Sequence, residues 1–349
     1  MDKLIEAISR TGNPSVVGLD PKPALIPAPV LDGAHAAHPE SRAAALADAY
    51  RAFNKAVIDA VADIVPAVKP QVAMYEALGP IGIQLFCDTC AYAAERGLYV
   101  LGDVKRGDIG STAALYASHL GGVPDVAEFG EGFGTRVENP WHEDAVTVNP
   151  YLGEDGVMPF VDVADAAGKD IFVLVRTSNP SSSQLQTLPL RSGSDDESPA
   201  STVADQVADL VEQWGAGTRG EHGYSRVGAV VGATHPEEGA ALRRRMPHTF
   251  FLVPGYGAQG GSASDVAGMF DADGSGAIVN SSRGIIGAWR KDPRAADFTQ
   301  TGYARQGADP DAAEREAIAD DARRSLQLVG DSARNAALAM RKDLTSALR

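Results

Sequence analysis

The sequence of 349 residues predicts an α/β protein in which eight parallel strands alternate with helices and close into a (β/α)8, or TIM, barrel. The candidate strands are continuous apolar runs, which is typical of parallel strands buried on both faces. Helical patterns follow these runs, so that a strand–helix unit recurs eight times. An open doubly wound sheet is the alternative, but no G-x-G-x-x-G motif follows the first strand.

Each strand candidate is a short run rich in Val, Ile, Leu or Phe. In chain order the runs are SVVGLD (15–20), PAVKPQ (66–71), LYVLGDVK (98–105), AVTVNP (145–150), IFVLVRTS (171–178), VGAVVGAT (227–234), FFLVPGYG (250–257) and GAIVNSSR (276–283). Helical patterns lie between them at 43–65, 78–96, 110–118, 156–167, 201–214, 236–245 and 262–270, and a long helix is expected at 311–348. We interpret residues 1–349 as a single barrel domain, since barrels of this length are common.

Three segments exceed a minimal barrel and are expected to be loop insertions. Residues 28–42 are rich in Ala, Pro and His, residues 118–142 are Gly-rich and acidic, and residues 184–200 are polar. Residues 292–311 are expected to be a polar linker that leads into the last helix. No internal repeat is visible beyond the strand–helix alternation.

The composition excludes several classes of partner. The formal net charge of −15 predicts a surface that repels nucleic acid and anionic membranes, and it resembles the surfaces of proteins adapted to high salt. No apolar stretch of about 18 residues is present, and MDKLIEAISR lacks the basic and then apolar pattern of a signal peptide. We therefore expect a cytoplasmic protein. Cys87 and Cys90 have the spacing of a redox or zinc pair, but no second pair completes a zinc set, which favours a structural role.

Polar residues gather where the candidate strands end, and barrels form their active sites at that rim. These residues are Asp20, Lys69, Asp103, Lys105, Ser178, the segment PGYGAQGG (254–261) and Arg283. Taken singly, several have other interpretations. Asp20 is consistent with a helix cap, Ser178 with turn chemistry before Asn-Pro, and Arg283 with a structural salt bridge.

The segment after the seventh strand favours a phosphate site. Gly260 and Gly261 follow Gln259, and we expect their backbone N–H groups to be free for an anion. Arg283 follows the eighth strand, and a guanidinium suits a phosphate because it donates two parallel hydrogen bonds. Barrels commonly hold phosphate after strands seven and eight.

The motif D-V-K-R-G-D (103–108) is the strongest indication of catalysis. Asp103 and Lys105 are two apart, so on an extended strand they point to the same face. Asp108 follows Gly107, where the chain can turn. A carboxylate–ammonium–carboxylate row in a pocket of low dielectric would keep Lys105 protonated, with coupled titrations. Such a row is costly for stability and useful for catalysis, although a structural ion network is the alternative.

These residues together resemble the orotidine 5′-phosphate decarboxylase family. The resemblance rests on D-x-K-x-x-D with Ile109 and Thr112, on GLD, Lys69, TSNP and PGYGAQGG, and on the Arg of NSSRG, in order from about 15 to 285. The chain's larger size, VKPQVAMYE and TSNPSS are similar to the longer, type 2-like branch. The family implies a barrel enzyme of pyrimidine (UMP) biosynthesis that acts on a nucleotide without a cofactor or metal ion.

The resemblance implies a role for each residue. Lys105 would protonate C6 of the pyrimidine, Asp103 would face the substrate carboxylate, and Asp20 and Lys69 would bind the ribose. Asp108, Ile109 and Thr112 would reach the site of a neighbouring subunit in a homodimer. The remaining contacts would be Ser178 to the pyrimidine, and Pro254, Gln259, Gly260 and Arg283 around the phosphate.

The chemistry of the residues agrees with this reaction. The sequence shows no flavin, pyridoxal or thiamine motif and no metal-ligand cluster at a strand end, so electrostatic stabilisation of a carbanion remains. The Gly-rich loop around Gln259 is a candidate lid. Two alternatives remain open: a magnesium-dependent decarboxylase of sugar-acid phosphates that shares the motif, and a phosphate-binding barrel without catalysis.

Overall fold

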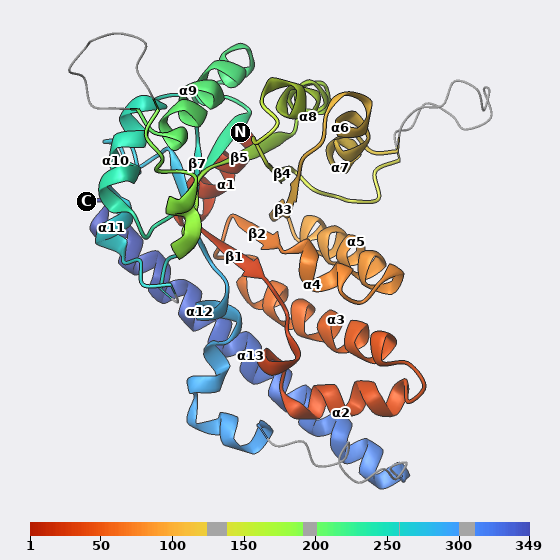
Figure 1. Cartoon of the computed structure of the whole chain (residues 1–349). Helices are drawn as coiled ribbons and strands as arrows, with labels where there is room; N and C mark the ends of the chain where they lie inside the picture. The colour runs from red at the N-terminus through yellow and green to blue at the C-terminus, as the bar shows by residue number, and fades with distance from the viewer. Residues whose placement is uncertain (124–137, 191–200, 258, 300–310) are drawn as a thin grey trace, which may run out of the picture.

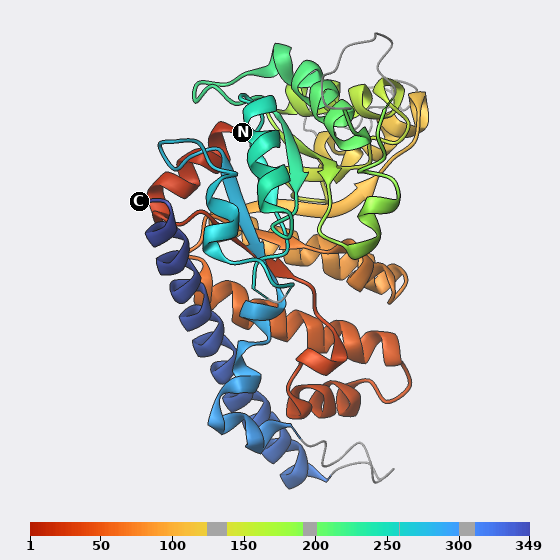
Figure 2. The ribbon, with the colours of Figure 1, turned by 60° about the vertical axis from the view of Figure 1, so that its left-hand side comes forward.

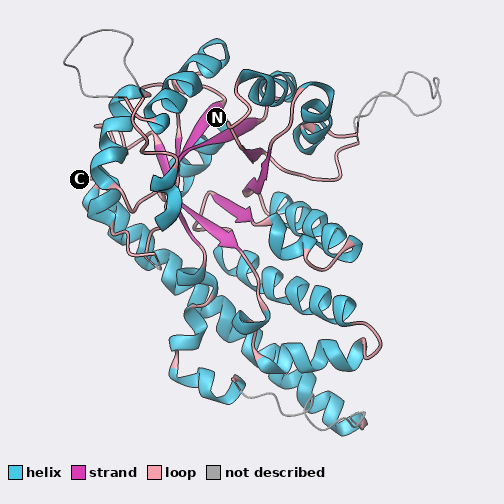
Figure 3. Cartoon of the chain, viewed as in Figure 1, coloured by secondary structure: helices cyan, strands magenta, loops and turns pink. Residues whose placement is uncertain are grey.

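The computed structural model describes residues 1–123, 138–190, 201–257, 259–299 and 311–349. Eight parallel strands pair in chain order, and β8 pairs with β1, so the sheet is a closed barrel surrounded by helices (Figures 1 and 3). The strands are β1 (Ser15–Leu19), β2 (Ala67–Pro70), β3 (Tyr99–Arg106), β4 (Ala145–Val148), β5 (Asp170–Arg176), β6 (Val227–Val231), β7 (Phe251–Val253) and β8 (Ala277–Ser281). The closed ring confirms the predicted barrel and excludes the open sheet.

The helices cover the outside of this barrel. They are α1 (Asp2–Thr11), α2 (Ala28–Ala37), α3 (Arg42–Val61), α4 (Val72–Glu76), α5 (Pro80–Glu95), α6 (Gly110–Tyr116), α7 (Ser118–Gly121), α8 (Glu154–Ala167), α9 (Val203–Gly215), α10 (Pro236–Arg245), α11 (Ala263–Ala267), α12 (Arg283–Ile286) and α13 (Ala312–Ala347). Short 3-10 turns are η1 (Pro23–Leu25), η4 (Pro180–Gln184), η5 (Ala216–Thr218), η6 (Ala288–Lys291) and η7 (Pro293–Phe298). No described helix is long and apolar enough to cross a membrane.

Successive side chains along each strand alternate between the outside and the inside of the barrel. This alternation separates two apolar layers and places the polar residues at the carboxyl ends of the strands. Val17 and Val100 point outward to the helices, whereas Val16 and Leu101 belong to a second cluster inside the barrel. Because side chains alternate, the next inward positions toward the carboxyl ends follow at intervals of two. Those positions are Asp20 after Val16 and Gly18, Lys69 after Ala67, Asp103 after Leu101 and Thr147 after Ala145.

The segment 28–42 differs from the prediction, because it contains a helix rather than only a loop. Pro29 stands in the first turn of α2, where its missing N–H costs nothing. Val30 and Ala34 are one turn apart and buried, and the helix packs against α3 and α13. The apolar stripe is short, so the composition of the segment did not reveal the helix. α1 was also not predicted as a helix.

The other extra segments are described only in part. The expected insertion 118–142 begins with α7, and its residues 124–137 lie outside the described residues, as do residues 191–200 of the insertion 184–200. The expected linker 292–311 contains η7, where Phe298 is buried, and its residues 300–310 lie outside the described residues. The single-domain organisation stays a prediction.

The long terminal helix α13 runs along one side of the barrel and beyond it (Figure 2). It packs against α2, α3, α11 and α12, and it buries Leu328, Val329 and Met340. An N-terminal capping box at Asp311 and Glu314 fixes where the helix begins. α13 therefore joins the first and last strand–helix units of the chain.

Candidate active site

A cavity of about 770 Å³ opens at the carboxyl ends of the strands. Eight of the predicted site residues line it: Asp20, Lys69, Asp103, Lys105, Ser178, Pro254, Gln259 and Arg283. They come from β2, β3 and the segments that follow β1, β5, β7 and β8. The structure thus brings residues from across 264 positions of the chain, from 20 to 283, into one space.

Asp103 is the centre of the site's polar contacts. Its Oδ2 accepts hydrogen bonds from Lys69 Nζ at 2.6 Å and from Gln71 Nε2 at 2.9 Å. Its Oδ1 accepts from Thr147 Oγ1 at 3.0 Å and from Lys105 Nζ. One carboxylate therefore lies between two ammonium groups, an arrangement that we call the Lys–Asp–Lys row (Lys69, Asp103, Lys105).

The row fixes the charges of its buried members. Burial alone would raise the pKa of Asp103, but Lys69 and Lys105 hold it well below its usual value. Burial alone would lower the pKa of Lys69, but the carboxylates of Asp103 and Asp20 raise it above its usual value. Asp103 is 7% exposed and Lys69 4% exposed, so both charges persist in a largely dry environment because each has its partner.

The backbone conformation at Lys105 differs from the one that the sequence predicted. We expected an extended strand, but Lys105 has a φ of +45°, in the left-handed region, and the pairing of β3 with β4 shifts register between Gly102 and Arg106. The Lys105 N–H donates to Thr147 Oγ1 at 2.9 Å. A left-handed residue other than glycine is strained, and such strain is concentrated at functional sites. The bulge aims the ammonium into the cavity, where the side chain remains 45% exposed.

Asp108, Ile109 and Thr112 do not line the cavity of their own chain. The expected carboxylate–ammonium–carboxylate row with Asp108 is therefore wrong for a single chain. Asp108 Oδ1 accepts the N–H of Ile109 at 2.8 Å, directly before α6, whereas the Lys105 ammonium pairs with Asp103. Ile109 is 52% exposed and Thr112 is also exposed, so both face solvent in the single chain.

Ser178, Gln259 and Arg283 line the cavity on the side where the sequence predicted a phosphate, but the expected backbone donors differ. Ser178 Oγ donates to Gln259 Oε1 at 2.8 Å, which joins the segments after β5 and β7. The expected free N–H groups are not free, because Gly260 donates to the carbonyl of Gly257 at 2.9 Å and Gly261 donates to that of Gly255 at 3.2 Å. Gly260, with a φ of +100°, shapes this turn and does not line the cavity.

Arg283 is the exposed first residue of α12 and lines the same cavity. The adjoining wall contains Pro254, whose carbonyl accepts the N–H of Ala233 at 2.8 Å. Lys22, which the sequence reasoning missed, also lines the cavity. An anion bound here would therefore meet positive side chains in a protein whose overall charge is strongly negative.

Gln71, Thr147 and Asn280 line the site and were missed. Each stands at or near the end of a strand, and Thr147 and Asn280 were inside the quoted runs AVTVNP and GAIVNSSR. Their inward position on the alternating strand was the available signal. Asn280 Oδ1 and Asp20 Oδ1 are buried acceptors without a protein hydrogen bond, so a ligand with hydroxyl donors would satisfy groups that are costly to leave unpaired.

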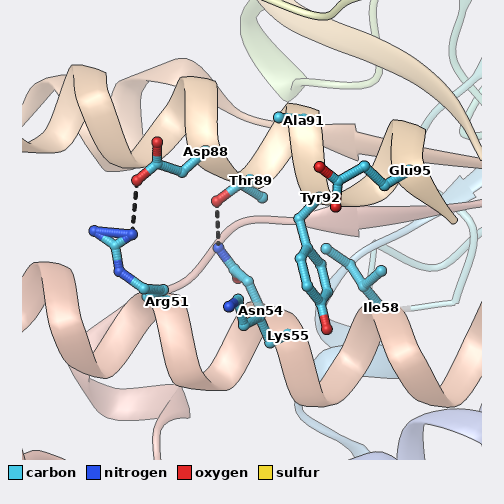
Figure 4. Close-up of a pocket in the computed structure, with 9 residues that line it drawn as sticks. All are labelled: Arg51, Asn54, Lys55, Ile58, Asp88, Thr89, Ala91, Tyr92 and Glu95. Atoms are coloured by element: carbon cyan, nitrogen blue, oxygen red, sulfur yellow. Dashed lines mark hydrogen bonds and ion pairs between the residues drawn. The ribbon is translucent and has the colours of Figure 1, made fainter.

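Buried hydrogen bonds between helices support the end of β1. Tyr75 OH donates to the carbonyl of Leu19 at 3.4 Å, and Asn54 Nδ2 donates to Tyr75 OH at 2.9 Å. Asn54 lies in the floor of a second cavity of about 250 Å³ between α3 and α5, where it also contacts Thr89 (Figure 4). The Leu19 carbonyl also accepts the N–H of Gln71 at 3.3 Å. These contacts connect the outer helices to the residue before Asp20.

Cys87 and Cys90 are both free thiols on α5. Burial, with the carboxylate of Glu143 nearby, raises the pKa of Cys87 to about 11 and the pKa of Cys90 well above its usual value. Among the described residues, no group of three or more His, Cys, Asp or Glu side chains is placed to hold a metal ion. The protonated thiols are in keeping with a structural role.

Comparisons with known proteins agree on one family. The model of the "Orotidine 5'-phosphate decarboxylase / HUMPS family" matches residues 16–297. A curated orotidine 5′-phosphate decarboxylase of Rhodopirellula baltica is 45% identical over 292 residues, which cover 83% of this chain and 89% of the relative. One from Clostridium acetobutylicum is 38% identical over 245 residues, which cover 70% of this chain and 77% of the relative.

Solved structures show the same likeness. The structure of Leishmania donovani OMP decarboxylase superposes with a TM-score of 0.61 at 26% identity and covers 99% of this chain and 97% of its own. The region matched by the family model, residues 16–297, contains every barrel strand except Ser15 of β1, and every residue of the cavity described above.

Proposed function

Because the chain belongs to the orotidine 5′-phosphate decarboxylase / HUMPS family, we propose that it converts orotidine 5′-monophosphate to uridine 5′-monophosphate and carbon dioxide in pyrimidine biosynthesis. The observation that carries the proposal is the Lys–Asp–Lys row, which lies in one cavity with Ser178, Gln259 and Arg283. A binding protein gains nothing from so costly an arrangement of buried charge, whereas a carboxy-lyase uses it.

Lys105 is the proposed proton donor. When the bond between C6 and the carboxylate carbon breaks, its electron pair stays on C6 and carbon dioxide leaves. The pyrimidine delocalises this carbanion poorly, so a fixed positive charge beside C6 lowers the barrier. The Lys105 ammonium then transfers its proton to C6, and the resulting amine regains a proton from water. Asp103 orients Lys105 through a direct hydrogen bond.

The rest of the cavity supports recognition of a nucleotide. Asp20 and Lys69 are the proposed contacts to the ribose hydroxyls. A hydroxyl would give the unpaired Asp20 Oδ1 a donor, and a hydroxyl oxygen would accept from the Lys69 ammonium. Ser178 is the proposed contact to the pyrimidine, and Gln259 and Arg283 hold the phosphate. Pro254 and Gly260 shape the segment that carries Gln259. Phosphate binding far from C6 supplies energy for closing the loop around Gln259.

We also propose a homodimer whose partner completes each site. Ile109, Leu115 and Tyr116 on and beside α6 are large exposed apolar side chains, as are Tyr151 and Leu152 before α8. Gly156 of α8 lies close to the carbonyl of Asp108 and α6 packs against α8, so we infer that these side chains share one surface. An apolar surface of this kind is typical of a protein interface. In the dimer, Asp108, Ile109 and Thr112 would reach the partner's substrate.

The dimer has a direct test. Leu115→Glu buries a charge in the proposed interface, so sedimentation should show a monomer, and turnover should fall at least tenfold. Leu188→Glu, at another exposed leucine in the segment after β5, is the matched control and should leave mass and turnover unchanged. A fully active monomeric Leu115→Glu variant would contradict the shared site.

The reaction is tested by following the loss of orotidylate absorbance with the purified chain. Turnover that persists in a chelator excludes the alternative of a magnesium-dependent sugar-acid phosphate decarboxylase. Binding of uridine 5′-monophosphate without any turnover would favour the non-catalytic barrel and refute the proposal. The proposal includes a cytoplasmic location, which cell fractionation tests.

A further inference from the structure

Arg176, the last residue of β5, is a buried cation outside the Lys–Asp–Lys row. It is 2% exposed and is among the largest fully buried side chains of the described chain. Its Nε donates to Glu238 Oε2 at 2.5 Å and its Nη2 to Glu238 Oε1 at 3.3 Å, which is a two-pronged contact with α10. The guanidinium therefore fixes the end of β5 against a neighbouring helix.

The other edge of the guanidinium holds the segment that follows β5. Arg176 Nη1 donates to Ser182 Oγ and, at 3.3 Å, to Gln186 Oε1. Gln186 in turn binds Thr177 twice: its Oε1 accepts the Thr177 N–H at 2.9 Å, and its Nε2 donates to Thr177 Oγ1 at 2.9 Å. Residues 177–186 are thereby closed into a ring by Arg176 and Gln186, a pair that we call the Arg176–Gln186 clamp.

The clamp lies beside Ser178, and Thr177 and Gln186 line the same cavity as Ser178. Ser178 follows Thr177, its carbonyl accepts from Thr234 Oγ1 at 3.3 Å, and its Oγ donates to Gln259 Oε1 at 2.8 Å. A Cβ on Gly232, directly after β6, would lie only 2.7 Å from Ser178 N. The backbone of Ser178 is therefore also packed closely against the end of β6. The Ser178 hydroxyl is therefore held from both sides at the point where it meets the segment after β7.

We propose that Arg176 and Gln186 are positioning residues for the decarboxylation, acting through Thr177 on the Ser178–Gln259 contact. This inference rests on the proposed function. Burying a guanidinium costs free energy, and apolar side chains could have linked β5 to its neighbours without that cost. The guanidinium, however, donates several hydrogen bonds in fixed directions, so it holds the segment after β5 in a single position. A displacement of about 1 Å at a substrate-positioning residue can cost about a hundredfold in rate. The inference also gives the described part of the insertion 184–200 a role, because Gln186 belongs to it.

The test uses Gln186→Ala as the main variant, since Gln186 is partly exposed and its loss leaves Arg176 paired with Glu238. We expect kcat/KM for orotidine 5′-monophosphate to fall tenfold to a hundredfold, with unchanged circular dichroism and unchanged melting temperature within two degrees or so. Glu238→Gln, which weakens the opposite edge at a half-exposed position, should give a smaller loss in the same direction. Gln213→Ala, at an exposed glutamine of α9, is the matched control and should match the wild type.

A double-mutant cycle separates positioning from general support of the fold. If Gln186 acts through Ser178, Gln186→Ala should cost less than about twofold once Ser178→Ala is present. Full additivity of the two losses, or wild-type kcat/KM for Gln186→Ala alone, overturns the clamp while leaving the proposed function intact. Absence of turnover in the wild type overturns the proposed function and the clamp with it.

Discussion

Replacing Asp103 with Asn should destabilise the protein far more than replacing Lys105 with Ala, although both residues belong to the Lys–Asp–Lys row. Asp103→Asn keeps the shape of the side chain and removes the negative charge between two ammonium groups. Lys69, which is 4% exposed, then loses its 2.6 Å partner and remains buried with its charge. Lys105→Ala instead leaves Asp103 bound to Lys69, Gln71 and Thr147.

The magnitude follows from these contacts. At 2.6 Å and an effective dielectric constant of about 20, the Lys69–Asp103 attraction is about 6 kcal/mol before desolvation is subtracted. Breaking a buried pair by removing one partner costs about 3–5 kcal/mol, and we expect that range for Asp103→Asn. The Lys105 side chain is 45% exposed, so solvent screens its pair with Asp103 and we expect a loss of at most about 1 kcal/mol for Lys105→Ala.

Urea unfolding of the wild type and both variants, followed by circular dichroism at pH 7, gives the two free-energy differences. The comparison also contains its own control, because both variants remove one charge from the same row. Equal losses for the two variants, or a loss below about 1 kcal/mol for Asp103→Asn, would refute the argument that burial of Lys69 dominates. Both variants should lack turnover, so the stability difference does not report on catalysis.

The stability difference between wild type and Asp103→Asn should be flat between about pH 5 and pH 9 in urea titrations. Because the pKa of Asp103 is lowered in the folded protein, its contribution to stability is complete above its unfolded pKa of about 3.9 and is lost as the pH falls through its folded pKa. Because the pKa of Lys69 is raised, its contribution is complete below its unfolded pKa of about 10.4 and is lost as the pH rises through its folded pKa. A stability difference that halves near pH 6.5 would contradict this reasoning. Gly102→Ala should cost about 1–3 kcal/mol of unfolding free energy, because the new Cβ would lie 1.7 Å from Glu143 Oε1 in a fully buried site, and wild-type stability would show that the site can relax. Cys87, with a pKa of about 11, should react with iodoacetamide at pH 8 on the order of a hundredfold more slowly than a free thiol, and alkylation at the free-thiol rate would refute the assigned environment.

The barrel was predictable because each strand is an apolar run buried on both faces, and such runs occur in few other settings. The inward positions of Asp20, Lys69 and Asp103 followed from alternation along those strands, and the structure places all three in the cavity. Gln71 and Thr147 were missed because a polar residue at a strand end has the same composition as a turn residue. Only the closed ring shows that both point at Asp103.

The local backbone was the part that the sequence could not supply. Nothing in D-V-K-R-G-D indicates that Lys105 is left-handed, since Lys rarely adopts that conformation and the neighbouring Gly107 is the natural place for a turn. Likewise, Gly260 suggested a free N–H donor, but the turn uses that N–H for its own carbonyl contact. At Lys105 the pairing of β3 with β4 decided the geometry, whereas at Gly260 a hydrogen bond within the turn did. The clamp at Arg176 was hidden because its partners are on α10 and in an insertion, far from it in the sequence.

The most direct test of the account compares turnover with product binding in Lys105→Ala. Decarboxylation of orotidine 5′-monophosphate should be abolished within the detection limit, because no other ammonium is oriented by Asp103 toward the cavity in the described chain except buried Lys69. Calorimetric binding of uridine 5′-monophosphate should weaken by less than about tenfold, since Ser178, Gln259 and Arg283 remain. Wild-type turnover in this variant would contradict the central claim that Lys105 stabilises and protonates the carbanion.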